Sequence, residues 1–232
     1  MKQLKLYGMS RAFNTTLKAS TIDELITYLI NSEYDDRENR KVERLINIAK
    51  FRYKAFMEEI DFDSSRRVEK NLINRLEFYD FIKNKQNFLI CGSTGFGKSF
   101  IATAIGYKAC MMGYKVMYFN INKLFSKLKM AKADGSYIKE INKIEKQDLI
   151  ILDDFGLQSL DNLKRQDLMV IIEDRHGKKS TIIASQFPVE SWHEVITEQT
   201  IADAILDRIV HNALRIELKG ESMRKKKIDK QS

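Results

Sequence analysis

The chain has 232 residues, which is enough for one core domain of ordinary size and a smaller appendage. Hydrophobic residues make up 44% and charged residues 31%, as in globular proteins, and no window approaches eighteen consecutive apolar residues, so we expect no transmembrane helix. The opening residues lack an apolar signal region, and two cysteines with three histidines are too few for a zinc module, so we expect reduced thiols and a cytoplasmic location.

Residues 1–84 show helical periodicity and no strand alternation. Thr21 and Glu24 have the spacing of a capping box, which predicts the start of a helix. Its predicted apolar side consists of Ile22, Leu25, Ile26, Leu29 and Ile30. We therefore expect a small all-helical module at this end of the chain.

A charged helix over residues 35–59 is predicted to follow, then a loop over 61–67 and a short helix around 72–81. The core side of the charged helix is predicted to carry Val42, Leu45, Ile46, Ala49 and Tyr53. The short helix would bury Leu72, Leu76, Tyr79 and Phe81. This segment has no internal repeat and no low-complexity run.

Beyond residue 85, short apolar runs alternate with helical patterns, which is the order that a parallel sheet requires. The five predicted strands are 87–91, 115–120, 149–152, 180–185 and 213–218. Among the intervening helices, that over residues 160–176 has the clearest pattern. The predicted fold class is therefore α/β, with a five-stranded parallel sheet in a domain spanning residues 85–232.

A glycine-rich segment joins the first predicted strand to a helix over residues 100–112. It matches G-x-x-x-x-G-K-[ST] in full: Gly92, Ser93, Thr94, Gly95, Phe96, Gly97, Lys98 and Ser99. Glycines let the backbone turn its N–H groups toward phosphate oxygens, and the helix N-terminus adds partial positive charge. Lys98 would reach the β- and γ-phosphates, and the Ser99 hydroxyl would ligate Mg²⁺. A chance glycine-rich turn is the alternative, which the strand–loop–helix context disfavours.

Two acidic residues, Asp153 and Asp154, end the third predicted strand. Carboxylates at the C-terminal ends of parallel strands lie in the crevice where such sheets bind ligands. Asp153 is then placed to hold Mg²⁺ opposite Ser99, and Asp154 to orient the attacking water or accept its proton. The N-K-x-D pattern of a guanine site has no good match, since Asn142 opens a segment that ends in Glu145. We therefore expect ATP with Mg²⁺.

Positive charge is unevenly distributed over the chain, whose net charge is +8. Residues 108–146 contain nine lysines against three acidic residues, and the tail beyond residue 220 is also basic. This pattern favours a polyanionic partner such as nucleic acid. A merely solvated basic surface is the alternative.

Several segments carry a resemblance to known families. Residues 92–99, 153–156 and 180–188 occur in an order that resembles the AAA+ ATPases. Residues 191–194, 201–211 and 220–224, with 6–9 and 36–40 near the start, resemble the IstB-like transposition helper ATPases of the DnaC/DnaA-like clade. The similarity covers essentially the whole chain.

The resemblance implies a bacterial insertion-sequence helper that oligomerises on double-stranded DNA and cooperates with an integrase-like transposase. It also implies site residues: Gln186 as the polar sensor near the γ-phosphate, Arg208 as the finger given to a neighbouring subunit, and Arg224 as the second sensor. An arginine suits such roles because its planar guanidinium stays charged. For Arg208 the alternative is a structural pair with Asp207 or Asp203.

The same resemblance implies that the segment between the second and third strands faces DNA. We expect Lys123, Lys127 and Lys132 to contact phosphates there, with the tail residues Lys225, Lys226 and Lys227 as a rival basic surface. The alternative is that these lysines belong to a solvated helix face and contact no ligand. The helical module over residues 1–84 would contact DNA or transposase.

Two residues depart from the family pattern. The usual acidic pair is Asp-Glu, and here Asp154 takes the place of the Glu; the sensor is often Asn, and here it is Gln186. The shorter carboxylate leaves the rate of hydrolysis open. Three other functions therefore stay in view: a replicative helicase loader of the DnaC type, a DNA-binding scaffold that uses ATP with little hydrolysis, and a small-molecule kinase. The last is a poor fit to residues 201–211.

Overall fold

A computed structural model describes residues 4–15, 21–60 and 80–218. Several sequence-based expectations lie outside these ranges. They are the loop over residues 61–67, the part of the short helix before residue 80, the Arg224 sensor and the basic tail with Lys225, Lys226 and Lys227.

The centre of the molecule is a five-stranded sheet in the order β2-β3-β4-β1-β5. Its strands are β1 (Asn87–Gly92), β2 (Val116–Asn120), β3 (Leu149–Phe155), β4 (Ser180–Ser185) and β5 (Ala213–Leu218). Every neighbouring pair is parallel, so all five carboxyl ends meet at one edge of the sheet. The predicted α/β class with five parallel strands is confirmed.

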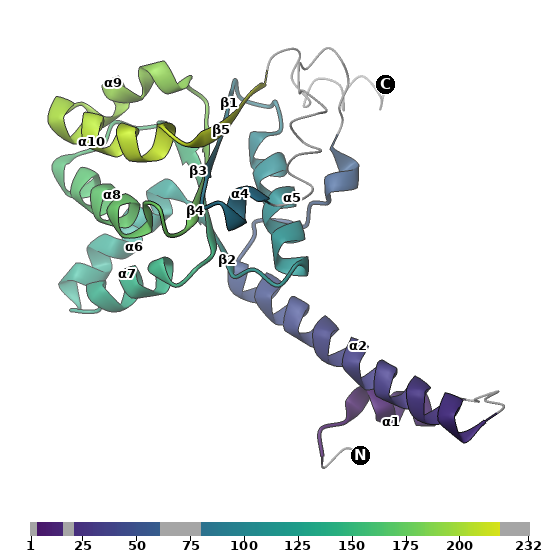
Figure 1. The fold of residues 1–232 in the computed structure, drawn as a ribbon. Coiled ribbons are helices and arrows are strands. Elements are labelled where there is room, and N and C mark those ends of the chain that lie inside the picture. Colours follow the sequence, from purple (N-terminus) through teal and green to yellow (C-terminus); the bar gives the residue numbers. More distant parts are fainter. Residues whose placement is uncertain (1–3, 16–20, 61–79, 219–232) are drawn as a thin grey trace, which may run out of the picture.

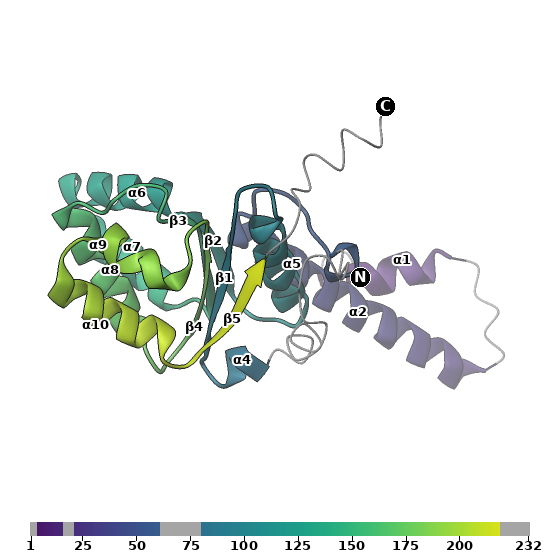
Figure 2. The ribbon, with the colours of Figure 1, turned by 90° about the horizontal axis from the view of Figure 1, so that it is seen from above.

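Helices cover both faces of this sheet (Figures 1 and 2). One face is covered by α5 (Lys98–Met111), the end of α2 (Ile22–Ala49), η1 (Met57–Glu59) and α4 (Asp80–Lys83). The other face carries α6 (Ile121–Ala133), α7 (Tyr137–Glu145), α8 (Asn162–Arg175), η3 (Val189–Ser191), α9 (Trp192–Ile196) and α10 (Gln199–Val210). The result is a three-layer sandwich with the sheet in the middle.

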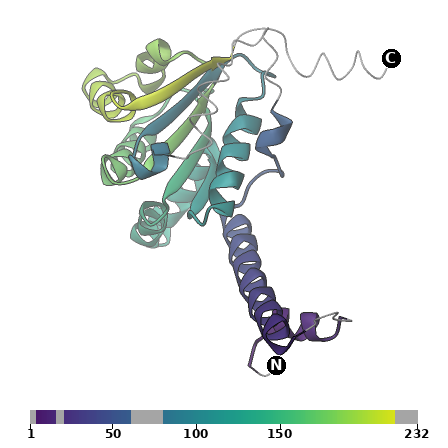
Figure 3. The ribbon, with the colours of Figure 1, turned by 45° about the vertical axis from the view of Figure 1, so that its right-hand side comes forward.

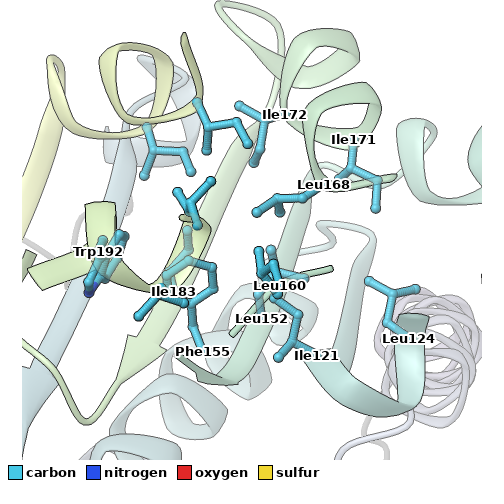
Figure 4. Packing of buried hydrophobic residues seen from close by; sticks show 14 of the residues in the cluster. Ile121, Leu124, Leu152, Phe155, Leu160, Leu168, Ile171, Ile172, Ile183 and Trp192 are labelled. Atoms are coloured by element: carbon cyan, nitrogen blue, oxygen red, sulfur yellow. The ribbon is translucent and has the colours of Figure 1, made fainter. Parts of the chain in front are cut away.

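The central parts of β1, β3 and β4 are apolar because both of their faces are buried, whereas the edge strand β5 has exposed positions at Arg215 and Glu217. In β1, Phe88 and Ile90 point to the α5 side, while Leu89 points to the opposite layer. In that second layer Phe155 and Trp192 pack with their ring centroids 4.6 Å apart (Figure 4). Each large side chain buried in this way contributes about 1.5–3 kcal/mol of hydrophobic stabilisation.

The first helices differ from the prediction. In place of two helices there is one, α2, of 28 residues, which leaves the body of the molecule and carries α1 (Tyr7–Phe13) at its far end (Figures 1 and 3). Thr21 caps it as predicted, accepting a hydrogen bond from Glu24 N. No Gly or Pro interrupts the sequence, so the helix continues until Lys50 takes a left-handed φ of 56°.

The side of α2 that packs against α1 is polar, and most of the predicted apolar side is exposed, although Leu25 and Leu29 are half-buried. Ile22 is 76% exposed, whereas Glu33 and Asp36 are buried. Glu33 accepts hydrogen bonds from Gly8 N and Met9 N, which lie at the start of α1. The prediction of an apolar inner face over residues 22–30 was therefore wrong, because charged side chains line the contact with α1: Arg11 of α1 pairs with Asp36, which Arg40 also contacts.

Residues on both sides of position 85 contribute to one hydrophobic cluster. Ala49, Ala55, Ile60 and Phe81 all lie in the hydrophobic cluster that α5 forms with the sheet. The end of α2 packs directly beside β2. Within the described residues, no helix is both long and apolar enough to cross a membrane.

Candidate nucleotide-binding site

The glycine-rich segment lies between β1 and α5, at the carboxyl edge of the sheet. Gly92 ends β1 with φ 148°, and a Cβ placed there would lie 2.6 Å from the carbonyl oxygen of Leu218 in β5. Gly97 precedes α5 with φ 86°, and open space surrounds the position of its missing Cβ. The first glycine therefore permits close strand packing, while the second permits the left-handed turn and leaves the loop accessible.

A cavity of about 370 Å³ opens over this loop. Its lining brings together predicted residues from three places in the chain: Thr94, Gly95, Gly97, Lys98 and Ser99 from the loop, Asp154 near the end of β3, and Gln186 after β4. Asp153 and Ser93 contact these residues, as described below. The structure therefore places these residues together at one edge of the sheet, where the sequence predicted them.

Lys98 is the first residue of α5, and its side chain turns back over the loop. The ammonium donates a hydrogen bond of 2.8 Å to the carbonyl oxygen of Ser93. Burial lowers the pKa of Lys98, while the nearby charges of Asp153 and Asp154 act in the opposite direction. The ammonium is thus held at the rim of the loop, on the side that faces the two carboxylates.

Asp153 is buried and receives three hydrogen bonds. The Ser99 hydroxyl and the backbone N–H of Asp154 both donate to its Oδ1 at 2.9 Å, and the Tyr118 hydroxyl donates to its Oδ2. Burial, followed by the contact with Asp153, raises the pKa of Tyr118, so its hydroxyl stays a donor. The carboxylate is therefore held rigidly between α5 and β2.

The donors at this point fit a Mg²⁺ ion. Ser99 and Asp153 offer one hydroxyl and one carboxylate oxygen at hydrogen-bonding distance from each other. Among the described residues there is no cluster of three or more Asp, Glu, His or Cys that could hold a metal. Mg²⁺ suits such a sparse site, because it is usually held by one or two protein oxygens together with substrate phosphates and water.

Asp154 is turned toward the cavity by its backbone. It has φ 63°, and the pairing of β3 with β4 is irregular between Leu152 and Phe155. Such a left-handed conformation at a residue other than glycine costs on the order of 1 kcal/mol. The Asn120 amide donates a 2.7 Å hydrogen bond to Asp154 Oδ2. Burial, and next the charge of Asp153, raise the pKa of Asp154, whereas the Asn120 hydrogen bond lowers it.

Gln186 follows β4 and faces the loop across the cavity. Its side-chain oxygen accepts a 2.7 Å hydrogen bond from the Thr94 hydroxyl. An amide side chain on the opposite wall from Lys98 could contact the end of a bound triphosphate. The sensor position suggested by the sequence is therefore adjacent to the loop.

Arg208 lies at the other edge of the sheet. The Asn87 amide, at the start of β1, donates to the carbonyl oxygens of Arg208 and Ile209. Six residues of β1 separate this point from the loop, a distance of roughly 20 Å. Arg208 Nε lies 2.5 Å from Glu173 Oε2, so Arg208 forms a structural ion pair, as in the alternative considered from the sequence, but its partner is Glu173 and not Asp203 or Asp207. The Arg208 side chain therefore cannot reach the nucleotide-binding cavity of its own chain.

The three predicted DNA-facing lysines have different surroundings. Lys127 forms an ion pair with Glu140 of α7. Lys132 lies 2.6 Å from Asp167 of α8 and over the ring of Tyr137, so its charge holds helices together. Lys123 lines a separate cavity beside β2. The three lysines therefore do not form one continuous basic surface of unpaired side chains.

Four residues at the site were missed by the sequence analysis: Arg52, Tyr53, Tyr118 and Asn120. Asn120 ends a predicted strand at the binding edge, which is a signal that could have been used. Tyr53 was predicted to be core, but it lines the cavity and stacks near Phe100 with centroids 6.2 Å apart. Nothing in the pattern around Arg52 and Tyr53 indicates that the chain brings them to the loop.

Comparison with known proteins agrees with this geometry. The IstB-like ATP binding protein family matches residues 1–231. The insertion sequence ATP-binding protein y4pL of Sinorhizobium fredii is 40% identical over 230 residues, covering 97% of this chain and 94% of that protein. The ATP-binding protein of insertion sequence IS1162 from Pseudomonas fluorescens is 38% identical over 194 residues, covering 81% and 84%.

Solved structures show the same fold at low sequence identity. DnaI superposes with a TM-score of 0.63 at 20% identity, covering 76% of this chain and 94% of that one. The AMPPCP-bound DnaA from Aquifex aeolicus gives 0.62 at 19% identity, covering 78% and 56%. With the AAA+ fold, a phosphate-type loop and a family match over nearly its whole length, this chain belongs to the IstB-like ATP-binding proteins of insertion sequences.

Proposed function

We propose that this protein is an ATP-dependent DNA-binding helper of an insertion-sequence transposase, which oligomerises on target DNA and hydrolyses ATP to regulate target selection. The observation that supports it most is the convergence of the loop, both acidic residues and Gln186 on one cavity. The names of its relatives associate the family with insertion sequences and ATP. The partners would be double-stranded DNA, further copies of the chain and the transposase of the same element.

In this proposal the residues 92–99 bind the phosphates through backbone N–H groups and Lys98. Ser99 and Asp153 would hold Mg²⁺, which supplies charge neutralisation for the β- and γ-phosphates. Asp154 orients a water molecule and accepts its proton, and Gln186 contacts the terminal phosphate. Tyr53 and Arg52 lie where they could contact the rest of the nucleotide.

Arg208 acts on a neighbouring subunit in this proposal. The support for this is its distance from the loop of its own chain, which is set by the length of β1. An arginine that completes a neighbour's site makes turnover depend on assembly. Arg224, as second sensor, remains a proposal from the family resemblance alone.

A scaffold that binds ATP but turns it over very slowly is a second candidate. The side chain of Asp154 is one methylene shorter than that of glutamate, which favours this alternative because its carboxylate extends less far toward the attacking water. Burial, and next the charge of Asp153, also raise the pKa of Asp154. The two candidates share binding and assembly and differ only in hydrolysis.

Three substitutions test the proposal. Lys98→Ala should abolish ATP-dependent assembly on duplex DNA, seen by electron microscopy, whereas Lys108→Ala in the last turn of the same helix should not. Asp153→Ala should weaken Mg²⁺-dependent nucleotide binding. Asp154→Ala should keep nucleotide binding and stop phosphate release; equal phosphate release by wild type and this variant would favour the scaffold. Normal assembly of the Lys98→Ala chain with ATP would refute the nucleotide-controlled helper.

A further inference from the structure

A second cavity, of about 580 Å³, lies beside the nucleotide cavity and is larger than it. It is bounded by the edge strand β2, by α6 and by the end of α2. Its cationic residues are Lys50, Arg52, Lys123, Lys127 and Lys143, and among the residues that the structure describes Asp154 is the one carboxylate in its lining. Several positive charges around one cavity create a positive electrostatic potential that attracts anions.

The chain brings these cations together from three separate elements. Lys50 follows α2, and its left-handed backbone turns the chain so that Arg52 reaches the same hollow. Lys123 comes from the first turn of α6, and Lys143 from α7. The grouping arises only because the end of α2 packs beside β2 (Figures 1 and 3).

The cations are not equally available. Lys127 is paired with Glu140, whose pKa is lowered chiefly by that hydrogen bond. Among the described residues, Lys50, Lys123 and Lys143 form no ion pair. Positive charge for a ligand therefore comes mainly from these three and from Arg52.

From this arrangement we propose that the cavity binds the sugar–phosphate backbone of DNA. This inference rests on the proposed function and names the site for its DNA partner, with Lys50, Arg52 and Lys143 as new contacts. The apolar floor formed by Met117, Phe119 and Leu124 suits a sugar, and the cationic rim suits phosphates. The cations come from three separate elements and not from one glycine-rich loop, which distinguishes this cavity from a binding site for a nucleoside triphosphate.

The two cavities are joined by shared residues. Arg52 and Asp154 line both of them, and Asn120 in the DNA cavity holds Asp154 by its hydrogen bond. Because Arg52 lines both cavities, a phosphate that draws its guanidinium toward the DNA cavity removes positive charge from the nucleotide cavity. Binding at one cavity therefore changes affinity at the other, and by the same factor in both directions.

The test compares two charge-matched double variants of the full chain. Lys50→Gln with Lys143→Gln removes two cavity cations, and Lys139→Gln with Lys146→Gln removes two exposed lysines near α7 outside the cavity lining. Duplex affinity is measured by fluorescence anisotropy over a range of salt concentrations. The cavity pair should flatten the log–log salt dependence by about two and the control pair by much less. Binding of a fluorescent ATP analogue without DNA should be unchanged in both.

The possible outcomes separate this inference from the proposed function. If wild type binds no duplex, the DNA-binding helper itself fails. If wild type binds and both pairs lose the same slope, the cavity is not the DNA site. If the cavity pair weakens only the ATP analogue, the hollow is an extension of the nucleotide site and the inference is overturned.

A second measurement tests the coupling through Arg52. In wild type, a non-hydrolysable ATP analogue should change duplex affinity by a measurable factor, and Arg52→Gln should bring that factor toward one. Arg44→Gln, on the exposed part of α2, is the matched control. An undiminished factor in the Arg52→Gln chain would exclude Arg52 as the link.

Discussion

The side-chain amide of Asn120, at the end of β2, donates a 2.7 Å hydrogen bond to Oδ2 of Asp154, at the end of β3. The same side chain caps α6 by accepting a bond from Lys123 N through its oxygen. One residue thus joins the proposed water-orienting carboxylate to a helix that lines the basic cavity. The hydrogen bond to Asp154 also stabilises its ionised form.

The first prediction follows from the sign of that effect. Burial and Asp153 raise the pKa of Asp154 and the Asn120 hydrogen bond lowers it, so Asn120→Ala should raise this pKa further. Since the ionised form is the base, the acid limb of the ATPase pH profile should move to higher pH. Phosphate release between pH 5 and 8 measures the shift, with Asn142→Ala on α7 as control. An unmoved acid limb would mean that Asp154 is not the titrating base.

The second prediction concerns Tyr118, whose hydroxyl holds Asp153. Removing a hydrogen bond that orients a metal ligand typically costs about 10-fold in metal affinity. Tyr118→Phe should therefore raise the Mg²⁺ concentration needed for half-maximal binding of a fluorescent ATP analogue by about that factor. Nucleotide binding in EDTA should be unaffected.

Tyr137→Phe is the control for this measurement, because the Tyr137 hydroxyl donates to Asp167, on α8 and away from the loop. Equal Mg²⁺ dependence in the two variants would show that Tyr118 does not position the metal ligand. A loss of binding even in EDTA would instead point to a disturbed loop.

The third prediction concerns the shared site. Arg208→Ala chains should bind ATP normally and hydrolyse it poorly, because Arg208 serves the neighbour. Mixing them with Lys98→Ala chains should restore part of the activity, since one type of interface then has both an intact loop and an arginine. No recovery at any mixing ratio, with mixed oligomers verified by cross-linking, would exclude a site shared between subunits.

The fourth prediction concerns stability. The buried Arg175 donates to the carbonyl oxygens of Ile144, Gln147 and Ser180, which ties the end of α7 to the start of β4. Arg175→Met would remove these buried hydrogen bonds, although the Ile144 oxygen keeps the backbone N–H of Gln147 as a donor, so we expect a loss of about 3 kcal/mol in the free energy of unfolding. Urea unfolding measures it, and Arg44→Met should change it by less than about 0.5 kcal/mol. Similar midpoints for the two variants would contradict the role of Arg175.

Local sequence patterns were sufficient for the α/β domain. Apolar runs such as residues 149–152 predict buried strands because both faces of a parallel sheet are covered. The order of strand, glycine-rich loop and helix predicts the phosphate-binding element, since each part depends on residues adjacent in the chain. Asp153, Asp154 and Gln186 could be placed at the same edge because parallel strands end together there.

Contacts between segments that are distant in the sequence could not be predicted from local patterns, and only the tertiary structure revealed them. The inner side of α2 is polar because Glu33 meets the start of α1, a contact that no helical period reveals. Arg208 has Glu173 of another helix as partner rather than an aspartate nearby in the sequence. Arg52 lines the same cavity as Asp154 and Lys143 because α2 ends beside β2, and such an arrangement depends on packing over long sequence separations.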